Sequence, residues 1–85
     1  MEKYCLIIKE PLRFEVITGR DGNPILSTRR DLEQLMELGA LKCGMHQKPV
    51  EIRDYVGRAS TLRGLYRGER HVFGEKKVWE MYPDS

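Results

Sequence analysis

The feature that most constrains the fold is a run of five apolar residues near the start of the sequence, Tyr4–Ile8. Successive side chains of a strand point to opposite faces, so a continuous apolar run needs cover on both faces of the sheet. We therefore predict a strand in the middle of a sheet. The sequence has 85 residues, which suffices for one core but leaves little room for two. We expect residues 1–85 to form a single domain.

Turn signals predict two hairpins. Apolar and polar residues alternate over Arg13–Thr18, and the pair Asp21-Gly22 is typical of a tight turn, so we predict a β-hairpin over Arg13–Ser27. The stretch RHVFGEKKVWEMY, residues 70–82, predicts a second hairpin that turns at Gly74-Glu75. These segments supply the strands that a central Tyr4–Ile8 strand requires.

One helix is predicted between the hairpins, over Arg29–Leu38. Thr28 followed by Asp31 matches a capping pattern, and Gly39 or Gly44 could end the helix. The apolar residues recur at helical spacing, and the polar ones form a solvent-facing side. The apolar side begins with Leu32, Leu35 and Met36, and the polar side comprises Arg30, Glu33, Gln34 and Glu37.

These elements predict an α+β fold, in which a short antiparallel sheet packs on one α-helix. The segment Val50–Val56 fits a strand by alternation, with Val50, Ile52 and Val56 apolar, but it also fits a helix by spacing. The predicted core consists of Leu6, Ile8, Phe14, Val16, Leu32, Leu35, Met36, Val72, Val78 and Trp79.

An alternative fold follows from residues 50–68, VEIRDYVGRASTLRGLYRG, which are similar in places to a helix-turn-helix. Gly57 would lie at the turn, Ser60 would cap the recognition helix, and Arg63 and Arg67 would face a DNA groove. The resemblance implies a winged helix-turn-helix with an N-terminal β-hairpin. The sequence departs from the pattern at Arg58, where an apolar residue normally fills the core, and at Arg53, where a small residue normally lies.

Positive charge is concentrated in residues 57–77, which hold six basic and two acidic residues, while the rest of the chain holds nine and eleven. Arginine binds phosphate or carboxylate oxygens with paired donors, and aromatic rings can stack on unpaired bases. The alternative is that these cations only keep the surface soluble, and that Tyr66 and Phe73 belong to the core. The predicted nucleic-acid or partner-binding residues are Arg58, Arg63, Arg67, Arg70, Lys76, Lys77, Tyr66 and His71.

Four residues are candidates for a metal site. Cys43 and His46 form a Cys-x-x-His step, and Cys5 and His71 could complete a set of four zinc ligands if the fold gathered them. One such step is a weak signal, so we expect no metal and no other cofactor. Because the N-terminal apolar run is too short for a signal peptide, we expect a cytoplasmic protein with both cysteines reduced.

The sequence has no local signature of an activated cysteine nucleophile, and it has no glycine-rich phosphate-binding loop. We therefore expect neither an enzyme nor a small-molecule substrate. It also contains no run of apolar residues long enough to span a membrane. We predict a small non-enzymatic binding protein, such as a nucleic-acid-binding accessory or regulatory factor that uses the basic residues. The alternative is a protein-binding modulator or inhibitor, of the kind that phages and mobile elements encode, which docks on a larger host protein by a free strand edge or the basic residues.

Overall fold

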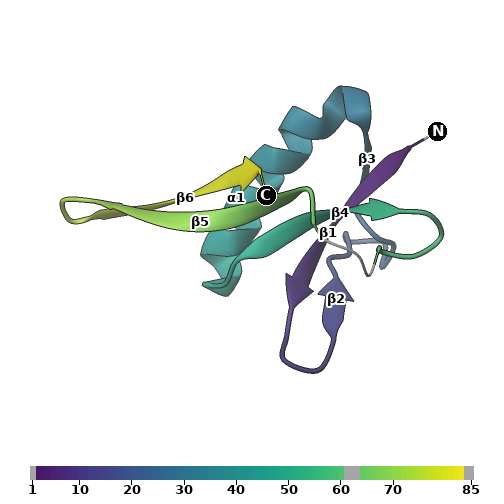
Figure 1. The fold of residues 1–85 in the computed structure, drawn as a ribbon, viewed down its shortest axis with the longest axis horizontal. Coiled ribbons are helices and arrows are strands. Elements are labelled where there is room, and N and C mark those ends of the chain that lie inside the picture. Colours follow the sequence, from purple (N-terminus) through teal and green to yellow (C-terminus); the bar gives the residue numbers. More distant parts are fainter. Residues whose placement is uncertain (1, 61–63, 84–85) are drawn as a thin grey trace.

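The computed structural model describes residues 2–60 and 64–83, which form an antiparallel sheet with one helix packed against it (Figure 1). This is the predicted α+β class. The sheet contains six strands in the order β2-β1-β4-β5-β6, and β3 pairs with β1 beside this path. The strands are β1 (Lys3–Lys9), β2 (Phe14–Val16), β3 (Leu26–Thr28), β4 (Val50–Tyr55), β5 (Tyr66–Phe73) and β6 (Lys76–Pro83). A turn of 3₁₀-helix, Arg29–Asp31, precedes the α-helix α1, Leu32–His46.

The central position of β1 is confirmed. It pairs with β4 along one side over six residues, while β3 and β2 pair with its N-terminal and C-terminal parts on the other side. Its run of five apolar side chains contributes to two separate cores. Tyr4, Leu6 and Ile8 lie in the core beneath α1, and Cys5 and Ile7 lie in a smaller core on the opposite face.

The segment predicted as a hairpin over Arg13–Ser27 is only partly paired with itself. β2 and β3 each pair with β1, and the single bridge between their flanking segments joins Thr18 to Pro24. The predicted turn is present, since Gly22 has a φ of +80° and Asp21 accepts hydrogen bonds from the backbone and side chain of Asn23. The central strand β1 therefore organises both segments.

The helix is longer than predicted and ends at His46 rather than at Gly39 or Gly44. Gln47 adopts the left-handed conformation, with a φ of 54°, and its backbone N–H donates to the Cys43 carbonyl. Thr28 makes no capping hydrogen bond from its side chain to the backbone, so the predicted cap is absent. Gly39 lies inside the helix and faces the sheet. A glycine suits this close approach, because a Cβ atom there would lie 3.2 Å from Sδ of Met81.

The alternative fold is wrong, because the segment expected to form its first helix is a strand. Val50–Tyr55 forms β4. Arg67 lies on β5, Tyr66–Phe73, and not on a recognition helix, while Arg63 lies outside the described residues. Gly57, the predicted turn residue, has a positive φ of 72°. Ser60, the predicted helix cap, donates its backbone N–H to the carbonyl of Asp54 near the end of β4. β4 is a strand because β1 offers it a complete antiparallel partner.

The main core lies between α1 and the sheet, and it includes the predicted Leu6, Ile8 and Leu35. The predicted core residues Leu32, Met36 and Trp79 are half-buried against it, as Phe14 and Val16 are against the smaller core. Val78 is half-buried. Val72 is wrongly predicted, since it is 60% exposed. It lies where β5 has passed beyond the rest of the sheet.

Candidate binding surface

Most of the predicted binding residues lie on the hairpin formed by β5 and β6. β5 pairs with β4 at only two positions, Glu51 with Arg67 and Ile52 with Tyr66, but it pairs with β6 at eight. Beyond Arg67 the hairpin is therefore a two-stranded arm that projects away from the sheet (Figure 1). The arm carries Tyr66, Arg67, Arg70, His71, Lys76 and Lys77. Arg58 lies in the exposed loop after β4, and Arg63 lies outside the described residues.

The basic residues of the arm are divided between its two faces. Gly68 faces α1 so closely that a Cβ atom there would overlap Sγ of Cys43. Side chains alternate along a strand, so Arg70 is on the helix side of the arm and Arg67 is on the opposite side. The register with β6 assigns Lys77 to the helix side and Lys76 to the opposite side. The arm therefore presents two cations on each face.

Acidic residues are interspersed with these cations. Glu69 and Glu80 are opposite each other in the register, on the face away from α1, and Glu75 lies in the turn. Like charges at directly opposed positions destabilise a sheet, so this pair favours a cationic neighbour. The arm carries four basic and three acidic residues between Tyr66 and Pro83. Its charge is therefore mixed.

The ring of His71 contacts two other aromatic rings on the face away from α1. The ring of His71 lies 5.1 Å from that of Tyr82 and 6.3 Å from that of Phe73, between ring centroids. The Tyr82 hydroxyl donates to Glu80 Oε2 at 2.5 Å, and this hydrogen bond raises the pKa of Tyr82 above its ordinary value. Phe73 is 65% exposed, so its prediction as a core residue is wrong. Tyr66 is half-buried against the main core.

A groove of about 540 Å³ lies between the C-terminal half of α1 and β6. Its most exposed apolar side chains are Leu41 and Met45, which are 60% and 65% exposed. Their spacing of four residues puts them on one side of the helix. The sequence pattern contained this signal, but the predicted helix ended before it. The groove is lined by Ala40, Leu41, Gly44, Met45, Lys77, Val78 and Trp79.

The outer edge of β6 pairs with no other strand in the described part of the chain. Gly74 has a φ of 62°, and Glu75 does not have a positive φ, which is the pattern of the two-residue turns that close antiparallel hairpins. Because such a turn makes Phe73 and Lys76 a hydrogen-bonded pair, alternate residues of β6 direct their N–H and C=O groups outward. These residues are Lys77, Trp79 and Met81.

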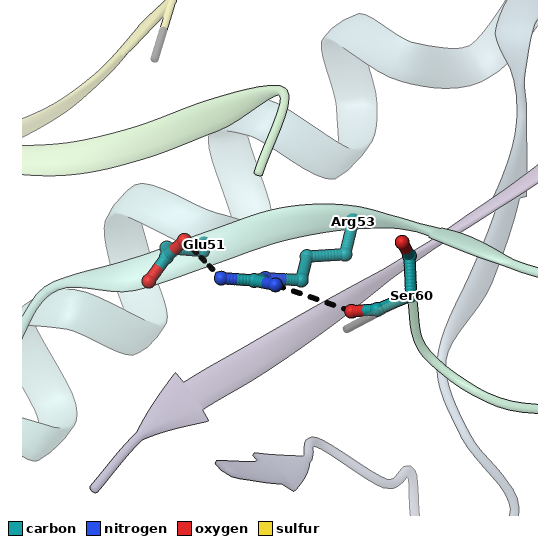
Figure 2. A network of polar contacts seen from close by, with 3 residues as sticks. All are labelled: Glu51, Arg53 and Ser60. Carbon is teal, nitrogen blue, oxygen red and sulfur yellow. Dashed lines mark hydrogen bonds and ion pairs between the residues drawn. The ribbon is translucent and has the colours of Figure 1, made fainter. Parts of the chain in front are cut away.

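An ion pair is buried on the face of the sheet away from α1, where sequence reasoning placed no special residue (Figure 2). Arg53 Nη2 lies 2.9 Å from Glu51 Oε1, and Arg53 Nη1 donates to the Ser60 carbonyl at 3.2 Å. The guanidinium also lies 5.4 Å from the centroid of the Phe14 ring. Both charges lie on the same face because side chains alternate along β4. The loop that covers them comes from residues after β4. Val56, in that loop, is 88% exposed.

The candidate metal ligands do not gather. Among residues 2–60 and 64–83 there is no group of three or more histidine, cysteine, aspartate or glutamate side chains that could hold a metal ion. Cys5 and Cys43 are free thiols in separate cores on opposite faces of the sheet. Burial raises the pKa of Cys5 to about 11 and also raises that of Cys43. Both thiols are therefore protonated at neutral pH.

Comparisons with models of protein families, with curated proteins and with solved structures find no match to this chain. Of the residues that the structure describes, none belongs to a helix of the length and apolar character needed to cross a bilayer.

Proposed function

We propose that this chain is a small non-enzymatic protein-binding modulator, which docks on a larger protein by accepting an extended segment at the edge of β6. One observation carries the proposal: the open edge of an eight-residue strand runs beside a groove with exposed apolar side chains. In strand addition, backbone hydrogen bonds supply affinity and neighbouring side chains supply specificity.

Each part of the surface has a role in this mode of binding. The outward N–H and C=O groups of Lys77, Trp79 and Met81 would extend the ladder to the incoming segment. On the helix side, Leu41 and Met45 would contact its apolar side chains. Lys76 and Lys77 favour a partner segment with acidic residues near the tip of the arm.

The mixed charge of the arm favours a protein over a phosphate backbone as the partner. Glu69, Glu75 and Glu80 lie among its four cations and would approach the phosphates with them. Exposed apolar residues, Val72 and Phe73, are next to the turn of the arm. Protein interfaces use exposed apolar and aromatic groups of this kind. We also infer a cytoplasmic location, which the two free thiols support.

The test removes one outward N–H without touching the β5–β6 ladder. Proline at position 77 lacks that donor, and proline is compatible with an edge strand when its nitrogen faces solvent. Lys77→Ala is the matched control because it removes the same side chain and keeps the N–H. Host lysate treated with nuclease is passed over wild type and both variants, and captured proteins are identified by mass spectrometry. A partner held by wild type and Lys77→Ala, but lost by Lys77→Pro, supports the proposal.

Amide hydrogen exchange on the captured complex gives an independent readout. The outward amides of Lys77, Trp79 and Met81 should gain protection when the partner binds, while those of β2 should not. A partner retained equally by all three proteins, with no added protection on β6, would contradict strand addition. Thermal melts of both variants check that the hairpin is intact.

Nucleic acid is a second candidate, and the shape of the arm supports it. A two-stranded ribbon with cations on both faces fits the width of a DNA major groove. If Arg67, Arg70, Lys76 and Lys77 each displaced a counterion, log K against log salt would have a slope of about −3 to −4. Replacing Arg67 and Arg70 with alanine would then flatten it by about two units. Electrophoretic mobility shift at low salt tests this, and no retardation of DNA or RNA would exclude it.

A further inference from the structure

We propose that a second copy of this chain occupies the edge of β6 when no other partner is bound, through antiparallel pairing of β6 with β6. The inference rests on the proposed function, because it names the first occupant of the same edge. It also implies regulation, since the chain must release its own copy before another segment can pair. An unprotected edge strand invites uncontrolled association, and closed self-pairing prevents it.

Symmetry limits how the two strands can pair. A twofold axis perpendicular to the sheet places the α1 helices of the two copies on the same face of the joined sheet. Directly opposed residues must then come from the same face, so the axis passes beside a single residue of β6. Five registers are possible near the middle of the strand, centred on Lys77, Val78, Trp79, Glu80 or Met81.

Charge selects one of these registers. When the axis passes beside Val78, Lys76 of each copy lies opposite Glu80 of the other on the face away from α1. On the helix side, Lys77 of each copy lies opposite Trp79 of the other, where an ammonium can approach an indole ring. Opposite charges at directly opposed positions stabilise a sheet. The strand is therefore complementary to itself in this register.

The other registers lack this complementarity. Centring on Lys77 opposes the two Lys77 side chains, and centring on Glu80 opposes the two Glu80 carboxylates, both of which are repulsive. Centring on Trp79 places Lys76 opposite Tyr82 and Val78 opposite Glu80, so no ion pair forms. Centring on Met81 places Glu80 opposite Tyr82, so no ion pair forms there either. Of these registers, only the one centred on Val78 forms ion pairs between the two copies.

Two structural features fit this register. Glu80 uses Oε2 to accept the Tyr82 hydroxyl, which leaves Oε1 to accept from a lysine of the second copy. Lys77 and Trp79 also direct their backbone groups outward, as the hydrogen-bonded pairs of the new ladder require.

Charge reversal with rescue tests the proposal. Sedimentation equilibrium is measured for wild type, for Lys76→Glu, for Glu80→Lys and for the double variant that exchanges the two charges. Each single variant places like charges opposite each other at two symmetric positions, so the dimer dissociation constant should rise by about tenfold or more. The double variant should restore dimerisation to within a few fold of wild type. Lys9→Glu and Glu15→Lys make the same changes on exposed residues of β1 and β2 and should leave the dimer unchanged.

The outcomes separate this inference from the proposed function. A monomeric wild type at about 100 μM, or a double variant that fails to recover while its melt is unchanged, would overturn self-pairing. Lys77→Pro should abolish the dimer, and a dimer that persists in this variant would also overturn it. Lys76→Glu keeps the outward backbone groups, so it should still capture a partner through β6. If Lys76→Glu loses the dimer and still captures a partner, self-pairing and strand addition are both supported. If the wild type is monomeric and still captures a partner, only strand addition is supported.

Discussion

The body of the protein and its β5–β6 arm are both built from antiparallel strand pairs, but they differ in how far their side chains are buried. In the body, β1 and β4 are covered by α1 on one face and by a loop on the other, and even two charged residues are buried. In the arm, Val72 and Phe73 remain exposed although both are apolar. Strand pairing alone does not bury a side chain, since burial requires a second layer. The body is therefore the source of stability, and the arm is available for binding.

The largest expected effect on stability comes from breaking the buried ion pair in the body. Glu51→Ala leaves the Arg53 guanidinium buried without its carboxylate, and loss of one member of a buried ion pair costs about 3–5 kcal/mol. Urea unfolding followed by circular dichroism measures the change. Glu15→Ala, an exposed glutamate on β2, is the control and should stay within about 0.5 kcal/mol of wild type. Equal stabilities for the two variants would show that the ion pair is not buried in solution.

The next effect concerns the packing beneath α1, which the tip of the arm lacks. Leu35 is 3% exposed beneath α1, so Leu35→Ala should lower the free energy of unfolding by about 2–5 kcal/mol. Thermal denaturation gives the loss, which is a large fraction of the total stability of a small domain. Leu41→Ala, on the exposed side of the same helix, should change stability by less than about 1 kcal/mol. A melt that Leu35→Ala does not shift would refute the packing of α1 on the sheet.

A smaller effect is expected where the arm leaves the body. Gly68→Ala places a methyl group against Sγ of Cys43, and overpacking of this kind costs about 1–3 kcal/mol. Gly44→Ala is the matched control, because its Cβ would lie 3.8 Å from Cδ1 of Trp79, an ordinary contact. Alanine at this helical position should stabilise by up to about 1 kcal/mol. Denaturant midpoints that moved in the same direction would contradict the close approach of β5 to α1.

In the arm itself, apolar truncation should hardly affect stability. Phe73→Ala removes a ring that is 65% exposed, so the free energy of unfolding should change by no more than about 0.5 kcal/mol. Chemical denaturation compares it with Leu35→Ala. A loss above about 2 kcal/mol would mean that the tip of the arm is packed against another part of the protein or a second copy.

No effect is expected from reduction. Cys5 and Cys43 lie in cores on opposite faces of the sheet, so a disulfide between them cannot form in the folded chain. Melting temperatures with and without dithiothreitol should agree, and a zinc chelator should change nothing. A drop in melting temperature with either reagent would show that the thiols bind each other or a metal.

Local patterns predicted the elements whose environment is determined by neighbouring residues. The Tyr4–Ile8 run indicated β1, the spacing of Leu32 and Leu35 indicated α1, and Gly74-Glu75 indicated the turn of the arm. The ambiguous Val50–Tyr55 segment became a strand only because β1 pairs with its whole length. The predicted binding residues were found largely on one arm, but the alternation of strands divided the cations between two faces.

The sequence by itself determined that this chain forms an α+β domain with a doubly covered central strand, because apolar periodicity reflects how backbone geometry directs side chains. Only the tertiary structure decided that Glu51 and Arg53 are buried, that Val72 and Phe73 are exposed, and that α1 continues through Gly39 and Gly44. The physical reason is the same in each case. Burial and close approach depend on which segment lies across the sheet, and residues distant in sequence provide that segment.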